Sequence, residues 1–406
     1  MSTYDPDSKP QLRPVEARAV ELDGGIGFLL HDPTGMAEAA LSVSEPALYL
    51  MSLMDGTNTL DEIRKQFGAR FHQPLSEKTL GDLVDGLEEA RMLAGESFER
   101  FYAEQVDAYL AAPTRPMRST EELGLDGDTA AVIADVLTAE PTVEPIGGRI
   151  VGLVAPHLDY PRGRVCYSAA YSTLARRAAP RRVVILGTNH FGRATSVVVS
   201  GKDFETPLGV TPTDRAFVEK LEERCGDLRA FEYDHLREHS IELQLLICQH
   251  LWGAGSFELV AALCPDPCGP TGTAPYDGNG VDLLAFGRTL GALLADDDTD
   301  TLVIAGADLS HIGMHFGDEC ELDDAFCAQV AERDAQALEQ LGANRADSFV
   351  EQVAREDNPT RVCSAGCIFT AMTALPAAQV RVLRYHQAVD AEAQVGVTCA
   401  AAVFTE

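Results

Sequence analysis

The sequence Ile150-Val151-Gly152-Leu153-Val154-Ala155-Pro156-His157-Leu158-Asp159-Tyr160 joins an apolar strand pattern to polar, reactive side chains. Pro156 has no N–H to donate, so a sheet ladder ends there and the His157 imidazole can leave the core. Apolar runs at residues 183–186 and 302–305 likewise stop shortly before turns that contain histidine or aspartate. Because ligands of an open α/β sheet bind where parallel strands end, these turns are predicted to meet in one pocket.

The candidate side chains lie in four separate turns, and they are His157, His190, Asp308 with His311, and Cys363. Cys363 precedes an apolar helix predicted over residues 368–375, and a thiol at a helix start has a lowered pKa. Two neutral imidazoles and one thiolate form a ligand set that a transition metal accepts. For each histidine taken alone, a purely structural hydrogen bond at a strand end explains the residue equally well.

A further polar segment, Glu238-His239-Ser240-Ile241-Glu242, begins a helix predicted over residues 240–251. Its acidic side chains suit the positive end of that helix. His239 is a candidate general acid or base, and a purely structural polar cluster is the equal alternative. The spacing of Asp308 and His311 predicts that both share one turn and that the carboxylate orients the imidazole.

Net charge narrows the classes of partner. Of 406 residues, 63 are acidic and 32 are basic, which gives a formal charge of −31. Such a charge disfavours nucleic acid and anionic membranes as partners. It is explained by a solvated acidic surface, and a cationic partner is the alternative.

The ten cysteines show no paired spacing, and the N-terminus shows no signal-peptide pattern. No apolar run approaches the ~20 residues that a membrane span needs. We therefore expect a protein of the reducing cytoplasm.

The first hundred residues have a pattern of their own. Residues 1–12 are polar and predict a disordered tail. Two strand-like runs at 17–22 and 26–31 flank Asp23-Gly24-Gly25, which predicts a hairpin. Three short helices are predicted next, over residues 44–54, 60–71 and 76–93. Together these elements predict a small winged-helix-like domain over residues 13–95.

Residues 96–147 predict a linker, with a connecting helix at 96–110 and a helical patch near 129–137 in a stretch rich in Pro, Thr and Gly. From residue 148 to 406, strands alternate with helices, as is typical of an α/β fold. The predicted strands cover residues 150–154, 183–186, 196–199, 257–263, 302–305, 380–386 and 395–404. The further predicted helices cover residues 168–178, 214–225, 281–294 and 322–341.

The first domain resembles the PqqD family, the peptide chaperone of pyrroloquinoline quinone biosynthesis. The resemblance rests on residues 48–63, which include Asp55-Gly56-Thr57-Asn58-Thr59, and on residues 83–93. Relatives of that family recognise leader peptides in other peptide-modifying systems. The resemblance implies a leader or precursor peptide as partner, with a radical-SAM enzyme as a possible pathway partner.

The remainder resembles the Memo family, which includes human Memo and the group called AmmeMemoRadiSam system protein B. The motifs that carry the resemblance are Ala155-Pro156-His157 with Tyr160, Gly187-x-Asn189-His190, residues 204–209, residues 238–242, Asp308-Leu309-Ser310-His311 and Cys363. The resemblance implies the fold of class III extradiol dioxygenases. It further implies His157, His190 and Cys363 as metal ligands, and Asp308, His311, Glu238 and His239 as pocket residues.

Two departures from the family pattern bear on the pocket. Leu158-Asp159 stands where small residues are usual, which predicts a narrower and more acidic pocket, and Ser364 stands where glycine is usual. The dioxygenases use two histidines and a glutamate, whereas Cys363 supplies a softer, oxidisable thiolate. This ligand set favours Fe(II) first and copper second.

These features favour a metal-dependent oxidoreductase that acts on a peptide presented by the PqqD-like domain. One alternative is a non-catalytic module that binds a peptide or phosphopeptide in the same pocket. A less favoured alternative is a metallohydrolase, which needs a Zn²⁺-bound water and works without oxygen.

Overall fold

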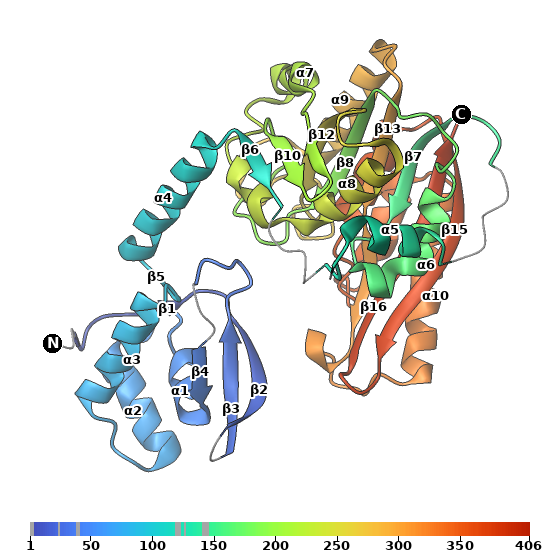
Figure 1. Ribbon diagram of the computed structural model, residues 1–406. Helices are drawn as coiled ribbons and strands as arrows, with labels where there is room; N and C mark the ends of the chain where they lie inside the picture. The colour runs from blue at the N-terminus through green and yellow to red at the C-terminus, as the bar shows by residue number, and fades with distance from the viewer. Residues whose placement is uncertain (1–3, 23–24, 38–40, 118–122, 126, 140–145) are drawn as a thin grey trace. The chain divides into compact units, whose positions relative to one another are not determined.

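A computed structural model describes residues 4–22, 25–37, 41–117, 123–125, 127–139 and 146–406 (Figure 1). The chain divides into two compact units, Met1–Ala111 and Ala112–Glu406.

The first unit combines an antiparallel sheet with a small helical core. Its strands β2 (Glu16–Leu22), β3 (Gly25–His31) and β4 (Leu41–Ser44) pair in the order β2-β3-β4. The helices that follow are α1 (Glu45–Ser52), α2 (Leu60–Phe71) and α3 (Glu77–Glu89). A capping box between Thr59 and Glu62 fixes the start of α2. The predicted hairpin strands are confirmed, while Asp23 and Gly24 of its turn lie outside the described residues.

The prediction of a disordered tail over residues 1–12 is wrong for residues 4–12. Strand β1 (Gln11–Leu12) pairs with β5 (Leu93–Ala94), and the Leu12 N–H donates to the Met54 carbonyl at 2.7 Å. The Leu60 N–H donates to the Ser8 carbonyl at 2.9 Å. Residues 1–3 lie outside the described residues.

The helices predicted at 96–110 and near 129–137 are both confirmed, but the prediction that they stand in a linker is wrong. Helix α4 (Glu96–Ala111) belongs to the first unit, where the Arg13 guanidinium lies 3.8 Å from the centre of the Phe98 ring. Strand β6 (Thr114–Pro116) joins β10 (Asp203–Thr206) in a parallel pair. Helix α5 (Thr129–Leu137) buries its apolar side in the second unit. Residues 118–122, 126 and 140–145 of the predicted linker lie outside the described residues.

The second unit is built on an eight-stranded sheet. Its centre consists of four parallel strands, in the order β7 (Ile150–Ala155), β13 (Thr301–Gly306), β8 (Arg182–Thr188) and β12 (Glu258–Cys264). The antiparallel strands at its sides are β9 (Val198–Val199), β14 (Asp308–Ile312), β15 (Gln379–Asp390) and β16 (Val395–Thr405). The α/β prediction is confirmed, and the four central strands coincide with predicted ones.

Helices cover both faces of this sheet (Figure 1). One face carries α5, α6 (Tyr160–Tyr171) and α8 (His239–Trp252). The other carries α7 (Arg215–Cys225), α9 (Leu283–Asp296), α10 (Asp324–Gly342), α11 (Ala346–Ala354) and α12 (Ala365–Ala374). Successive residues at the end of β7 point to opposite cores, Leu153 and Ala155 to one and Val154 to the other. A parallel sheet buried on both faces explains the continuous apolar runs in the sequence.

The helix predicted over residues 168–178 is wrong in its bounds. The Asp159 carboxylate accepts a hydrogen bond from the Arg162 N–H and lies 2.5 Å from the Arg162 Nε, so α6 begins at Tyr160. The same carboxylate was predicted to make the pocket more acidic, but it caps this helix instead.

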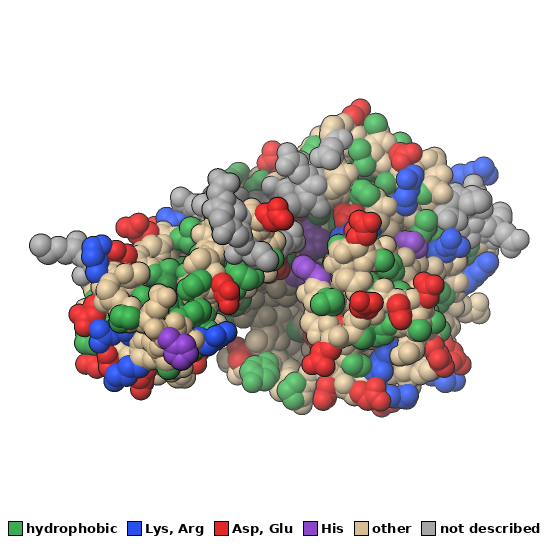
Figure 2. All heavy atoms as spheres, turned by 90° about the horizontal axis from the view of Figure 1, so that it is seen from below, with side chains coloured by type: hydrophobic (Ala, Val, Ile, Leu, Met, Phe, Trp, Pro, Cys, Tyr) green, Lys and Arg blue, Asp and Glu red, His purple; other side chains and the backbone are tan. Residues whose placement is uncertain are grey.

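Acidic side chains are scattered over the face drawn in Figure 2, with basic ones between them, as the net charge of −31 leads one to expect. Within the described ranges, no helix combines the length and the apolar character needed to cross a lipid bilayer.

Candidate metal centre

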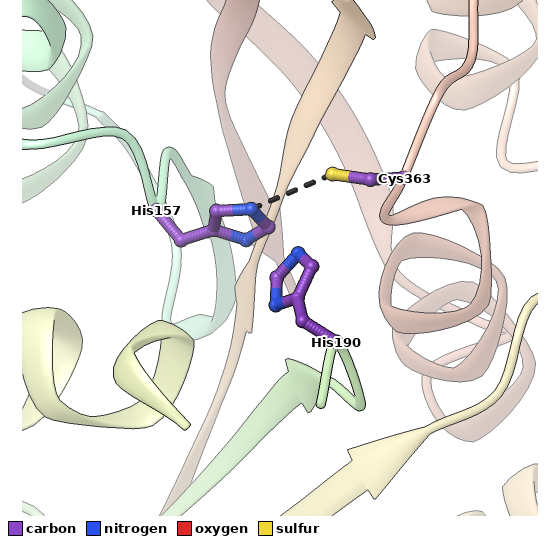
Figure 3. A group of neighbouring side chains, drawn as sticks. All are labelled: His157, His190 and Cys363. Atoms are coloured by element: carbon purple, nitrogen blue, oxygen red, sulfur yellow. Dashed lines mark hydrogen bonds between the residues drawn. The ribbon is translucent and has the colours of Figure 1, made fainter. Parts of the chain in front are cut away.

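Three predicted residues from distant parts of the chain point toward one another. His157 follows β7, His190 follows β8, and Cys363 precedes α12 (Figure 3). One ligand atom from each lies within 4.8 Å of the others. The Cys363 Sγ lies 3.4 Å from the His157 Nε2, and the two imidazole centres are 4.9 Å apart at right angles.

Both imidazoles have a fixed orientation. The His157 Nδ1 lies 3.1 Å from the Gly306 carbonyl oxygen. The His190 Nδ1 lies 3.1 Å from each oxygen of the Glu238 carboxylate. Because these acceptors take an Nδ1–H, Nε2 is the ring nitrogen that each histidine has left for a metal, and His190 must lose its second proton to bind one.

Glu238 anchors the loop that carries His190. Its carboxylate also accepts hydrogen bonds from the His190 N–H at 3.0 Å and the Ser240 N–H at 2.9 Å, and it caps α8. Burial alone would raise the pKa of Glu238, but the charge and hydrogen bond of His190 hold that pKa far below its usual value. The same pairing raises the pKa of His190 against the opposing effect of burial.

Asp308 contacts His157 and not the residue predicted. Its carboxylate accepts a hydrogen bond from the His157 N–H at 3.1 Å and lies 3.6 Å from the His157 Nε2. Burial raises the pKa of Asp308 to about 6. The predicted pairing of Asp308 with His311 is wrong, because both residues lie on strand β14 with an irregular register between them rather than in a turn.

The His311 ring has other neighbours. Its Nδ1 lies 3.1 Å from the Leu309 carbonyl, and its ring centre lies 5.1 Å from that of Phe316. Burial lowers the pKa of His311, which the charge of Cys363 partly offsets.

Cys363 lies in surroundings that favour a thiolate. Burial by itself would raise the pKa of the thiol, but the charge of His311 and the hydrogen bond and charge of His190 lower it below its ordinary value. The Ser364 hydroxyl lies 3.1 Å from the Cys363 Sγ. The predicted direction of the pKa is therefore confirmed, with neighbouring histidines as its main cause.

His239 completes the cluster of rings. It stacks on His190 with centres 5.1 Å apart and an interplanar angle of 17°, and its centre lies 5.4 Å from that of His157. Burial lowers the pKa of His239 to about 3, so the ring is neutral near pH 7. All seven predicted site residues thus gather around the carboxyl ends of the central strands.

Glycines let α8 approach the strand ends. A Cβ at Gly187 would collide with the Ser240 hydroxyl, and one at Gly306 would meet the Ser240 carbonyl oxygen at 2.6 Å. The Thr188 N–H donates to the Ser240 hydroxyl at 3.0 Å. This close approach brings Glu238 and His239, at the start of α8, beside the histidines of β7 and β8.

The sequence interpretation missed two contributors to the site. Gln244 is fully buried on α8 and donates to the Pro156 carbonyl at 2.6 Å, directly before His157. Arg115 is buried beneath the start of α8. A polar residue at an apolar position of a helix could have revealed Gln244, whereas Arg115 lies in the stretch that was predicted as a linker.

The residues present fit a transition metal. Two imidazole nitrogens and a thiolate are ligands that iron, copper and zinc accept. Ligands at about 2.3 Å (sulfur) and 2.0 Å (nitrogen) from one tetrahedral metal lie roughly 3.5 Å from each other. The 3.4 Å between Cys363 and His157 agrees with that separation.

Fold and site together define an α/β protein with a histidine–histidine–cysteine cluster at the carboxyl ends of its central strands. A family model described as Memo-like protein matches residues 129–403, which is more than half of the chain. The chain belongs to this family.

Several curated relatives are similar over most of their length. A MEMO1 family protein of Aquifex aeolicus is 24% identical over 345 residues, which cover 83% of this chain and 84% of the relative. One of Thermus thermophilus is 25% identical over 346 residues, 83% of this chain and 96% of the relative. Among solved structures, the uncharacterized protein JW3007 of Escherichia coli K12 has a TM-score of 0.38 at 14% identity, covering 63% of this chain and 99% of that one.

Proposed function

We propose that the second unit is a metal-dependent redox enzyme whose metal is Fe(II) or, as the second choice, copper. The observation that carries the proposal is the convergence of a His157 ring nitrogen, a His190 ring nitrogen and the Cys363 thiol within 4.8 Å. A thiolate is soft and electron-donating, which favours these redox metals over Mg²⁺ or Ca²⁺. When bound, such a metal would supply electron transfer to or from a substrate.

The protein groups around the ligands have separate tasks in this proposal. The Gly306 carbonyl and the Glu238 carboxylate hold the two imidazoles in place, and Asp308 anchors the backbone N–H of His157. His239 is a neutral ring against both ligands, and this position makes it the first candidate for moving a proton there. His311, near Cys363, is the second candidate for moving a proton.

The proposed substrate is a peptide held by the first unit. Strands β2 and β4 form the two edges of its sheet, and an extended peptide can add to such an edge by main-chain hydrogen bonds. The PqqD-like sequence pattern of residues 48–63 and 83–93 supports a leader or precursor peptide as this partner. A radical-SAM enzyme or another enzyme of the same reducing compartment is the proposed pathway partner.

The acidic side chains of α3, which include Asp82, Glu88 and Glu89, favour a leader that carries basic residues. Binding of such a leader to the full chain should weaken as the salt concentration rises, because salt screens exposed charges. Isothermal titration calorimetry with peptides encoded near the gene measures this. A full chain that binds none of them at low salt would contradict the peptide proposal.

Metal content and oxygen uptake after anaerobic purification test the enzyme proposal. Bound iron or copper near one per chain, with oxygen uptake on addition of reductant, supports it. Metal-free protein that still binds a peptide would favour a non-catalytic module. Bound zinc with hydrolysis in the absence of oxygen would favour a metallohydrolase.

Matched cysteine variants make this test specific. Cys363→Ser removes the proposed thiolate ligand, whereas Cys320→Ser removes an exposed free cysteine elsewhere in the same unit. Loss of metal in the first variant alone is the expected result. Equal metal content in both would remove Cys363 from the ligand set.

A further inference from the structure

Arg115 is an almost fully buried cation that lies outside the part of the chain matched by the family model. It is 1% exposed on strand β6, and the matched region begins at residue 129. Burying a guanidinium is costly unless its donors are paired. Its partners therefore indicate what the buried charge stabilises.

The guanidinium of Arg115 joins three points of one short segment. Its Nε and Nη2 donate to the His235 carbonyl at 2.8 and 2.7 Å, and Nη2 also donates to the Glu238 carbonyl at 2.9 Å. Nη1 pairs with the buried Glu242 carboxylate, one turn into α8. The Phe204 ring lies beside it, 5.2 Å from the guanidinium carbon.

These contacts hold the joint between the 3-10 helix η1 (Glu232–Arg237) and α8. Both anchors of the His190 loop lie on this joint. Glu238 binds the ring and the N–H of His190, and Asp234 accepts hydrogen bonds from the Asn189 Nδ2 at 3.0 Å and the Ala194 N–H at 2.9 Å. A displacement of the joint would therefore move the His190 ring.

We propose that Arg115 is a positioning residue of the metal centre, which acts on His190 through the backbone and carboxylate of Glu238. The inference rests on the proposed function, because it gives Arg115 a role in metal binding. Arginine suits this role better than lysine, since its planar fork of donors reaches two carbonyls and a carboxylate at once.

The chain offers a matched control in Arg182. That residue is 5% exposed, lies 2.7 Å from the Asp214 carboxylate and 3.0 Å from the Asp297 carboxylate, and its guanidinium lies 4.0 Å from the Phe217 ring centre. Arg182 begins β8, whereas His190 follows its end, so the strand separates them by about 20 Å. Both Arg→Lys substitutions should cost stability, but only the one at Arg115 should affect the metal centre.

The experiment titrates Co²⁺ into the full-length wild type, Arg115→Lys and Arg182→Lys, followed by the thiolate-to-cobalt absorption. Changes to groups that orient a metal-bound histidine typically weaken affinity by about 10–100-fold. We expect a loss of this size in Arg115→Lys and a change of less than about 3-fold in Arg182→Lys. Equal losses in both variants, or none in Arg115→Lys, would overturn the proposal.

A double variant, Arg115→Met with Glu242→Leu, tests the proposal even if the single variant does not fold. Replacing a buried ion pair by apolar side chains of similar volume is often tolerated. The double variant still leaves the His235 and Glu238 carbonyls without their donor. It should therefore lose cobalt affinity as Arg115→Lys does, and retention of full affinity in the folded double variant would contradict the proposal.

Histidine ring ¹⁵N chemical shifts in the metal-free proteins provide an independent readout, with His190→Gln to assign the signal. The His190 shifts should be the same in the wild type and in Arg182→Lys, and should differ in Arg115→Lys. Unchanged shifts in Arg115→Lys would contradict the proposal. If the wild type binds no cobalt, the metal function fails, and these shifts still decide whether Arg115 positions His190.

Discussion

At the scale of single residues, metal binding depends on which ring nitrogen of each histidine is already hydrogen-bonded to the protein. The Gly306 carbonyl and the Glu238 carboxylate each occupy an Nδ1, so both Nε2 atoms face the Cys363 thiol. Asp308 adds a contact to His157 on the same side. His311 makes a hydrogen bond to a backbone carbonyl instead. Asp308 and His311 should therefore respond differently to substitution.

Asp308→Asn should weaken metal binding by about 10–100-fold, because it removes the charge of a carboxylate that lies beside the ligating His157. His311→Ala should keep its metal and lose about 10²–10⁴-fold in oxygen-dependent turnover, the usual contribution of an acid or base. Metal titration and oxygen uptake on both variants measure this. Loss of metal in His311→Ala with normal binding in Asp308→Asn would reverse the two assignments.

His235 should make folding sensitive to pH. Burial, with a further contribution from the charge of Arg115, lowers the pKa of His235 to about 3, and its Nδ1 has no partner within the described residues. The unfolded chain binds a proton near pH 6.5 that the folded state resists, so this contribution to stability is complete above pH 6.5. It is lost as the pH falls from 6.5 toward 3, at up to about 1.4 kcal/mol per pH unit.

Urea unfolding of the wild type and His235→Gln at pH 7, 6 and 5 isolates this contribution. The glutamine amide can keep the hydrogen bond to the Val198 carbonyl, which His235 makes at 3.1 Å. The difference in free energy of unfolding between the two proteins should shrink as the pH falls. A difference that stays constant would refute the buried neutral state of His235.

At the scale of elements, one buried carboxylate ties α10 to three strands. Asp334 is 2% exposed and accepts hydrogen bonds from Ser310 on β14 and Thr398 on β16, both at 2.6 Å, and from Tyr385 on β15 at 2.8 Å. Since β14 carries Asp308 and His311, the hydrogen bonds of Asp334 also stabilise the part of the site that lies on this strand.

Asp334→Ala should lower the free energy of unfolding by about 3 kcal/mol, because two buried hydroxyls and the partly buried Tyr385 hydroxyl lose an acceptor. Glu332→Ala, at an exposed position of the same helix, is the control and should change it by less than about 0.5 kcal/mol. Chemical denaturation measures both. Equal free energies of unfolding for the two variants would show that the hydrogen bonds of Asp334 do not stabilise the fold.

The strands and helices also differ in how well the sequence predicts them. The strands before His157 and His190 were predicted because buried parallel strands leave unbroken apolar runs. The start of α6 was predicted wrongly because Asp159 was interpreted as a pocket residue, whereas its side chain caps this helix. The partner of Asp308 was missed because three-residue spacing fits a turn as well as the strand observed. Arg115 was missed because its partners lie more than a hundred positions away in the sequence.

At the scale of the whole molecule, the chain joins a small unit with its own core to a Memo-like α/β unit. The order of the first unit extends to residues before its first predicted strand, since Pro10, Leu12 and Ser8 contribute backbone hydrogen bonds. A fragment of residues 1–111 should therefore fold by itself.

Removing residues 1–12 from that fragment should lower its free energy of unfolding by about 2–3 kcal/mol, through loss of several backbone hydrogen bonds. Thermal and urea unfolding of fragments 1–111 and 13–111 compare them directly. Identical transition midpoints would contradict the structure of this segment and restore the prediction of a disordered tail.

The central claim is that two imidazoles and the Cys363 thiolate bind one redox metal. X-ray absorption spectroscopy on the anaerobic, Fe(II)-loaded full chain tests it most directly. The wild type should show one sulfur near 2.3 Å together with imidazole scattering, and Cys363→Ser should lose the sulfur while retaining the imidazole signal. A wild-type spectrum with nitrogen and oxygen ligands only, unchanged in Cys363→Ser, would contradict the claim.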